Sequence, residues 1–163
     1  MIRTTFVAFC FLSLLACVKP TEYSNVPTLE FIGFSKQSLL QGTSGEDTVT
    51  MVLYFTDGDG DFGTEAKLTT PNIFIKDLRT NKQLSSFKAP FVPLEGAGNG
   101  ISGRIFVKLL STCCVFPENT GIPPCEKGTQ FAMNELSMEV HIQDRAGNIS
   151  NKVTTPALDL LCK

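Results

Sequence analysis

The sequence predicts an all-β fold, an antiparallel β-sandwich of about seven strands. Several segments alternate apolar and polar residues with a period of two, which is typical of strands that bury one face. Clusters of Gly, Pro, Asn and Asp separate these segments, and no long window combines a helical period with helix caps. Short alternating strands with turn signals between them are typical of a β-sandwich. We expect this domain to cover residues 29–163.

The N-terminal segment has the pattern of a secretory signal peptide. Arg3 supplies a positive charge, and residues 6–16 form an apolar run that is too short to span a membrane as a stable helix. The run ends in Leu14-Leu15-Ala16-Cys17, which resembles the lipobox of bacterial lipoproteins. The resemblance implies that residues 1–16 are removed and that Cys17 is lipidated. The alternative is an ordinary secretory signal with an unrelated cysteine.

A lipid on Cys17 predicts where the protein is located. Several acyl chains on one residue anchor a protein stably, whereas one chain gives only marginal binding. We therefore expect attachment to the bacterial outer membrane without a spanning helix, on either its periplasmic or its surface side. Residues 17–28 contain two prolines and no period, and they are predicted to be a lipidated tether.

The first four strands are predicted from their alternation and from the turns between them. Residues 29–34 alternate weakly, whereas residues 48–56 give the clearest pattern in the chain. Residues 72–78 follow Pro71, and residues 83–88 return as a hairpin partner after a turn. The residues of the second strand that are expected to face the core are Val49, Met51, Leu53 and Phe55.

Three further strands are expected in the C-terminal half. Residues 102–110 point Ile105, Val107 and Leu109 to one face, and residues 149–161 end the chain with Leu158 and Leu160 on one face. Residues 111–128, which contain three cysteines and three prolines, are expected to be irregular. The strand over residues 135–143 alternates clearly, with the inward residues Leu136, Met138, Val140 and Ile142.

The turn after residues 135–143 carries a family resemblance. Its sequence, Asp144-Arg145-Ala146-Gly147-Asn148-Ile149-Ser150, resembles the closing hairpin of bacterial immunoglobulin-like and fibronectin-like domains. The resemblance covers about a tenth of the chain and implies an immunoglobulin-like sandwich, but no particular activity. The Cys-Trp-Cys core of antibody domains is absent, because the sequence has no Trp.

Four cysteines remain once Cys10 leaves with the signal and Cys17 takes the lipid. An even number of cysteines in an exported chain is typical of disulfides. A bond between the adjacent Cys113 and Cys114 would be strained. The remaining choices are Cys114–Cys125 with Cys113–Cys162, or Cys113–Cys125 with Cys114–Cys162. Cys113 has the parity of the inward residues of strand 102–110, which favours Cys113–Cys162. The alternative is a zinc site formed by thiols and His141.

Residues 57–63 read Asp-Gly-Asp-Gly-Asp-Phe-Gly and directly follow the strongest strand. A curling backbone can aim Asp57, Asp59 and Asp61 at one point, and calcium takes six to eight oxygen ligands. The spacing resembles the first half of EF-hand-like and thrombospondin-type calcium loops. The resemblance carries over these three aspartates only, because the glycine comes one position late, at Gly63, and the twelfth position is Leu68 instead of Glu.

The expected topology supplies a fourth ligand. If the strands that precede Asp57 and Asp144 are strands B and F of an immunoglobulin-like sandwich, both aspartates lie at the same end of the domain. We therefore predict a structural Ca²⁺ site formed by Asp57, Asp59, Asp61 and Asp144, with Asn148 as a further candidate. The alternative is that these Asp, Asn and Gly residues only form turns.

The leading interpretation is a lipid-anchored protein of a bacterial envelope that acts as a binding or accessory module for a partner protein or a glycan. We do not expect an enzyme, because no catalytic motif is present and the single histidine, His141, is expected to face water. One alternative is a hydrolase that uses Asp57, Asp59 and Asp61 in an acidic cleft with aromatic walls. Another is a purely structural envelope subunit. A net charge of −2 and the lack of a basic patch argue against nucleic acid as a partner.

Overall fold

The computed structural model describes residues 22–43, 45–64, 69–93, 100–127 and 130–163. The predicted signal peptide (residues 1–16) and lipidation site (Cys17) lie outside the described residues. The described part is all-β, as predicted, with one short 3-10 helix, η1 (Glu118–Thr120). Its strands are β1 (Thr28–Phe34), β2 (Ser38–Leu40), β3 (Thr48–Asp57), β4 (Ile73–Asp77), β5 (Lys82–Phe87), β6 (Ile101–Leu110), β7 (Met133–Leu136), β8 (Met138–Ile142), β9 (Val153–Thr154) and β10 (Leu158–Leu161). In this part of the chain, no helix has the length and apolar character needed to cross a membrane.

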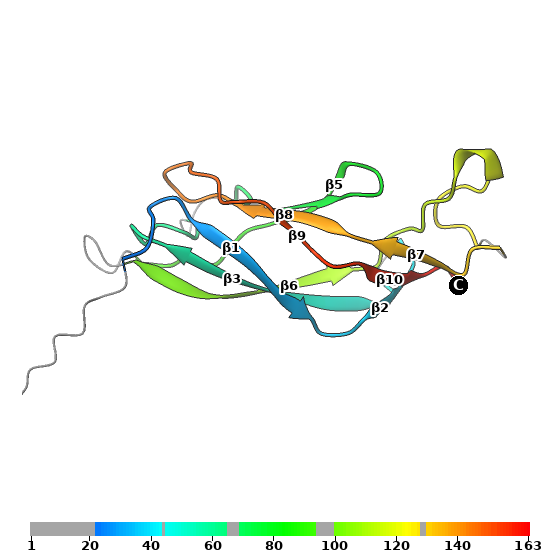
Figure 1. Cartoon of the computed structure of the whole chain (residues 1–163), viewed down its shortest axis with the longest axis horizontal. Helices are drawn as coiled ribbons and strands as arrows, with labels where there is room; N and C mark the ends of the chain where they lie inside the picture. Colours follow the sequence, from blue (N-terminus) through cyan, green and yellow to red (C-terminus); the bar gives the residue numbers. More distant parts are fainter. Residues whose placement is uncertain (1–21, 44, 65–68, 94–99, 128–129) are drawn as a thin grey trace, which may run out of the picture.

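Two antiparallel sheets form the layers of a sandwich (Figure 1). One sheet has the strand order β1-β3-β6, and the other has the order β5-β4-β8-β9. β1, β3 and β6 pair as strands A, B and E of an immunoglobulin-like domain do, and β4, β8 and β9 pair as strands C, F and G do. The predicted immunoglobulin-like sandwich is therefore confirmed, with β3 and β8 in opposite layers.

A third, smaller sheet extends one end of the sandwich. β10 pairs in antiparallel fashion with β7 and in parallel with β2. The predicted strands 135–143 and 149–161 are each divided in two, and β2 was not predicted, which together account for the strands beyond the expected seven. At these breaks the Thr155 hydroxyl accepts from the N–H of Met138, and Pro156 has no N–H to offer a neighbouring strand.

The core lies between the two main sheets and follows the predicted alternation. All four predicted inward residues of β3 are buried, and so are those of the segment that became β7 and β8. Val107 and Leu109 of β6 are buried as well, and Ile105 packs against the core. The period-two pattern therefore identified the core face of each long strand correctly.

The four described cysteines form two disulfides, Cys113–Cys125 and Cys114–Cys162. The preferred Cys113–Cys162 pairing is therefore wrong, and the swapped pairing is correct. No thiol of the four is left for the alternative zinc site. On the chain-entropy account, closing these loops of 12 and 48 residues contributes about 3 and about 4 kcal/mol, respectively.

The preference for a Cys113–Cys162 disulfide was wrong because strand β6 ends before the cysteines. The inward residues of β6 are odd-numbered, as at Val107 and Leu109. Beyond Leu110 the chain leaves the ladder, and the N–H of Cys114 donates to the side-chain oxygen of Gln41 at 3.2 Å. The alternation shifts there by one residue, so that Cys114 is fully buried and Cys113 is only half-buried.

Candidate metal centre

Four aspartates from opposite layers meet at one end of the sandwich. Asp57 is the last residue of β3, Asp59 and Asp61 follow in the loop, and Asp144 lies in the turn just beyond β8. One carboxylate oxygen from each of these residues lies within 4.8 Å of the others. The predicted convergence of Asp57, Asp59, Asp61 and Asp144 is therefore confirmed, and this group can hold a metal ion.

Backbone N–H groups fix three of these carboxylates. Phe62 donates to Asp57 Oδ2 at 2.7 Å, and Ala146 donates to Asp61 Oδ2 at 2.9 Å. Asp144 accepts from both the backbone and the side chain of Asn148, at 2.7 and 2.8 Å. The turn that the alternative interpretation requires is thus present at Asp144 and Asn148, together with the convergence of the four aspartates.

The remaining oxygens of the loop carboxylates have no donor. Oδ1 of Asp57, of Asp59 and of Asp61 is buried and accepts no hydrogen bond from any described residue. Asp57 as a whole is 0% exposed. A buried, unpaired acceptor costs about 1–3 kcal/mol, and more when it is charged. Three such oxygens at one point require a positive partner or a proton.

The electrostatics of the cluster agree with this geometry. Burial, together with repulsion from Asp59 and Asp61, raises the pKa of Asp57 to about 6, although the N–H of Phe62 opposes the rise. Burial also raises the pKa of Asp61, and the charges of Asp144 and Asp59 add to the effect. A bound cation would reverse both shifts, because it favours the charged carboxylates.

Arg145 is the cation nearest in sequence to the cluster. Its charge opposes the rise of the Asp61 pKa, but its described hydrogen bonds go to the backbone of the loops. Its Nε donates to the backbone oxygen of Asp61 at 2.8 Å, and its Nη2 donates to the backbone oxygen of Val92 at 3.3 Å. Its guanidinium also lies 5.9 Å from the ring centre of Phe91. Among the described ion pairs, none involves the four aspartates. Sequence reasoning did not assign Arg145 this role.

The end of the predicted tether packs against the acidic loop. The N–H of Gly58 donates to the backbone oxygen of Ser24 at 2.7 Å. A side chain at Gly58 would collide with backbone atoms of Tyr23 and Ser24. Pro27 is buried, so residues 22–27 belong structurally to the domain end that holds the aspartates. The loop therefore contacts the segment that leads to the predicted anchor.

A hollow of about 240 Å³ borders the cluster on the side of Asp144. The amide nitrogen Nδ2 of Asn72, one of its lining residues, is buried without an acceptor among the described residues. No described lining residue is aromatic, in contrast to the cleft that the hydrolase alternative requires. The lining residues are Gly63, Thr64, Thr70, Pro71, Asn72, Gln143, Asp144 and Arg145.

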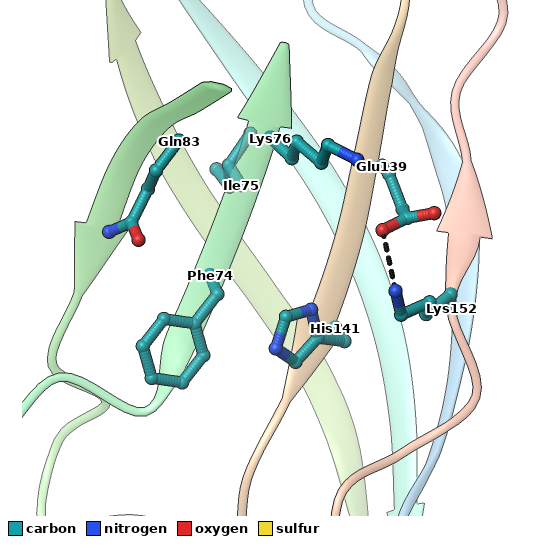
Figure 2. A pocket seen from close by; sticks show the side chains of 7 residues that line it. All are labelled: Phe74, Ile75, Lys76, Gln83, Glu139, His141 and Lys152. Carbon is teal, nitrogen blue, oxygen red and sulfur yellow. Dashed lines mark hydrogen bonds and ion pairs between the residues drawn. The ribbon is translucent and has the colours of Figure 1, made fainter. Parts of the chain in front are cut away.

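His141 lies away from the cluster, on the outer face of the β5-β4-β8-β9 sheet. Figure 2 shows it beside Phe74, with ring centres 5.1 Å apart and ring planes 17° from parallel. The two rings border a hollow of about 310 Å³, at whose other side Lys152 pairs with Glu139 at 2.9 Å. Burial and the charge of Lys152 lower the pKa of His141. His141 therefore faces outward, as expected, but is half-buried and not fully solvated.

Comparison of the chain with protein-family models, with curated proteins and with solved structures found no match.

Proposed function

We propose that this protein is an exported, lipid-anchored β-sandwich module of a bacterial envelope, stabilised at one end by calcium and acting as a binding or accessory module. The observation that carries the proposal is the set of three buried carboxylate oxygens without donors, on Asp57, Asp59 and Asp61, beside Asp144. Calcium would replace the missing donors and join the two layers at the end where loops are presented. The anchor would be the lipid on Cys17.

The chemistry of the cluster favours a hard divalent cation. All four ligand candidates are oxygens, without a thiol or an imidazole, which suits calcium or magnesium better than zinc. Two oxygens on one calcium ion lie at most about 5 Å apart, and the four oxygens here fall within 4.8 Å of one another. Backbone oxygens and water would supply the remaining ligands of a calcium ion.

The disulfides support export. Two disulfides in a chain of this size are typical of an extracellular or periplasmic protein. Calcium sites of extracellular modules have dissociation constants of about 10⁻⁴–10⁻³ M, which is sufficient where calcium is abundant.

Calcium titration of the mature chain tests the proposal. The protein carries Cys17→Ser, which removes the lipid, and it is titrated by calorimetry and by thermal unfolding. We expect saturable heat with a dissociation constant of about 10⁻⁴–10⁻³ M and a rise in Tm. Asp61→Asn should weaken both signals, whereas Asp159→Asn on β10 should leave both unchanged. Absence of heat and of any Tm change in the unsubstituted cluster would contradict the calcium site.

A further inference from the structure

Among the described residues, strand β6 is paired on one side only. It is 10 residues long and lies at the end of the β1-β3-β6 sheet, where it pairs with β3 from Ile101 to Leu110. On its other side, no backbone group of the described residues bonds to it. The N–H and C=O groups of such an edge are a ready template for another strand.

The outer face of this edge carries a regular row of side chains. Phe106 and Leu110 are 66% and 57% exposed, more than any other large apolar side chain of the described residues. Arg104 and Lys108 are exposed on the same face, two residues to either side of Phe106. Along the strand, this row therefore consists of a positive residue, an aromatic residue, a second positive residue and an apolar residue.

Two hollows lie along the same edge. The first, of about 380 Å³, is lined by residues 104–106 of β6 and by Pro90 and Val92 from the segment after β5. The second, of about 300 Å³, lies between Leu109 and the residues of β5 from Leu84 to Phe87. Ile105 and Leu109, one in each hollow, are four residues apart, which is about 14 Å along a strand. Side chains four residues apart on an added strand have the same spacing.

We propose that the β6 edge binds an extended, acidic segment of a partner protein as an additional strand. Apolar side chains on one face of the segment would enter the two hollows. On its other face, acidic side chains would lie opposite Arg104 and Lys108, with an apolar side chain opposite Phe106. This inference deepens the binding role proposed above by assigning it a surface and a ligand class.

The charges favour such a partner over a second copy of this chain. An antiparallel pair of β6 strands centred on Phe106 would cover the exposed rings, but it would place Arg104 opposite Lys108 of the second copy. Like charges directly opposite each other on neighbouring strands are destabilising. Acidic residues at the same positions turn this repulsion into attraction.

A synthetic peptide tests the proposal directly. The probe is the blocked peptide Thr-Val-Glu-Val-Phe-Val-Glu-Val-Thr, whose palindromic sequence places Glu, Phe and Glu opposite the row in either strand direction. We expect saturable binding to the mature Cys17→Ser chain and slower amide hydrogen exchange over residues 101–110. No saturable binding up to about 1 mM peptide, or protection confined to other strands, would overturn the proposal.

Charge reversal supplies the specificity test. Arg104→Glu with Lys108→Glu should weaken binding of the acidic peptide roughly tenfold, because two attractive cross-strand pairs become repulsive. A peptide with Lys in place of both Glu should bind this variant better than the wild type. Lys76→Glu with Lys163→Glu changes the net charge equally but lies off the edge, and it should leave binding unchanged. Equal weakening by both double variants would show nonspecific attraction and contradict the assignment.

The peptide result and the calcium result can fail separately. Binding is measured both in metal-free buffer and with calcium, because the β6 edge contains none of the four clustered aspartates. A missing calcium response with intact peptide binding would contradict the proposed calcium site but not the proposed peptide binding by β6. A normal calcium response without peptide binding would contradict the proposed binding by β6 but not the calcium site.

Discussion

Substitution of Asp57 by Asn should stabilise the metal-free protein and should abolish most of the stability that calcium adds. Asp57 is fully buried, its Oδ1 has no donor among the described residues, and its pKa is raised to about 6. The pKa of an ordinary aspartate is about 3.9, and each pKa unit corresponds to about 1.4 kcal/mol. At pH 7 without metal, keeping this carboxylate charged therefore costs the fold at most about 3 kcal/mol.

Asn keeps the size of the side chain and removes the charge. Its amide N–H can donate to the unpaired oxygens of Asp59 or Asp61, while its oxygen can still accept from Phe62. We expect the metal-free Asp57→Asn protein to be about 1–3 kcal/mol more stable than the metal-free wild type at pH 7. In 5 mM calcium the wild type should gain about 1–2 kcal/mol and the variant almost nothing.

Urea unfolding followed by circular dichroism measures the unfolding free energies of the wild type and of Asp57→Asn, each with and without calcium. Asp159→Asn serves as the control, because it removes one carboxylate from β10, away from the cluster, and should show neither effect. If Asp57→Asn destabilised the metal-free protein, the carboxylate would be favourable without a cation, and the reasoning would be refuted. A calcium gain of wild-type size in the variant would refute it equally.

Three further predictions follow from the same structure. Without metal, the contribution of Asp57 to stability should fall as pH rises from about 4 to about 6, because the folded state holds the Asp57 proton that the unfolded chain has already released. The difference between wild type and Asp57→Asn in urea unfolding at pH 4.5 and 7 measures this, because the opposite contribution of His141 cancels in it. With saturating calcium the trend should reverse, because the ion binds the deprotonated carboxylates. Replacing both Cys114 and Cys162 by Ser should lower the unfolding free energy more than replacing both Cys113 and Cys125. The reason is that the Cys114–Cys162 disulfide is buried and closes the longer loop, and the opposite order of the two effects would contradict this. Gly58→Ala should destabilise by about 1–3 kcal/mol and expose residues 22–27 to limited proteolysis, because the new methyl group collides with Tyr23 and Ser24.

The long strands could be predicted because the alternation of apolar and polar residues that identifies them involves only residues close together in the sequence. The alternation of β3, from Val49 to Phe55, is fixed by the period of an extended backbone and needs no knowledge of the rest of the chain. The same rule failed at Cys113, where the strand had already ended and Gln41, from a distant part of the sequence, bonded to the next cysteine. A parity argument holds only as long as the ladder that imposes it continues.

The candidate metal centre was predicted in part. The aspartates of the loop are visible as a pattern, and the expected topology, with strands B and F before Asp57 and Asp144, correctly brought Asp144 to the same end. The orientation of each carboxylate could not be predicted, because it depends on the N–H groups of Phe62, Ala146 and Asn148. Arg145 was not assigned a role, since its contacts to two backbone oxygens leave no signal in the sequence.

The extended segments, their buried faces and the run of alternating aspartates could be recognised in the sequence, because each depends on neighbours a few positions away. The pairing of the cysteines, the carboxylate oxygens without donors and the open edge of β6, all among the described residues, required the folded chain. These features depend on which segments pack together, as Cys114 with Cys162 and Asp57 with Asp144, and such residues are far apart in the sequence.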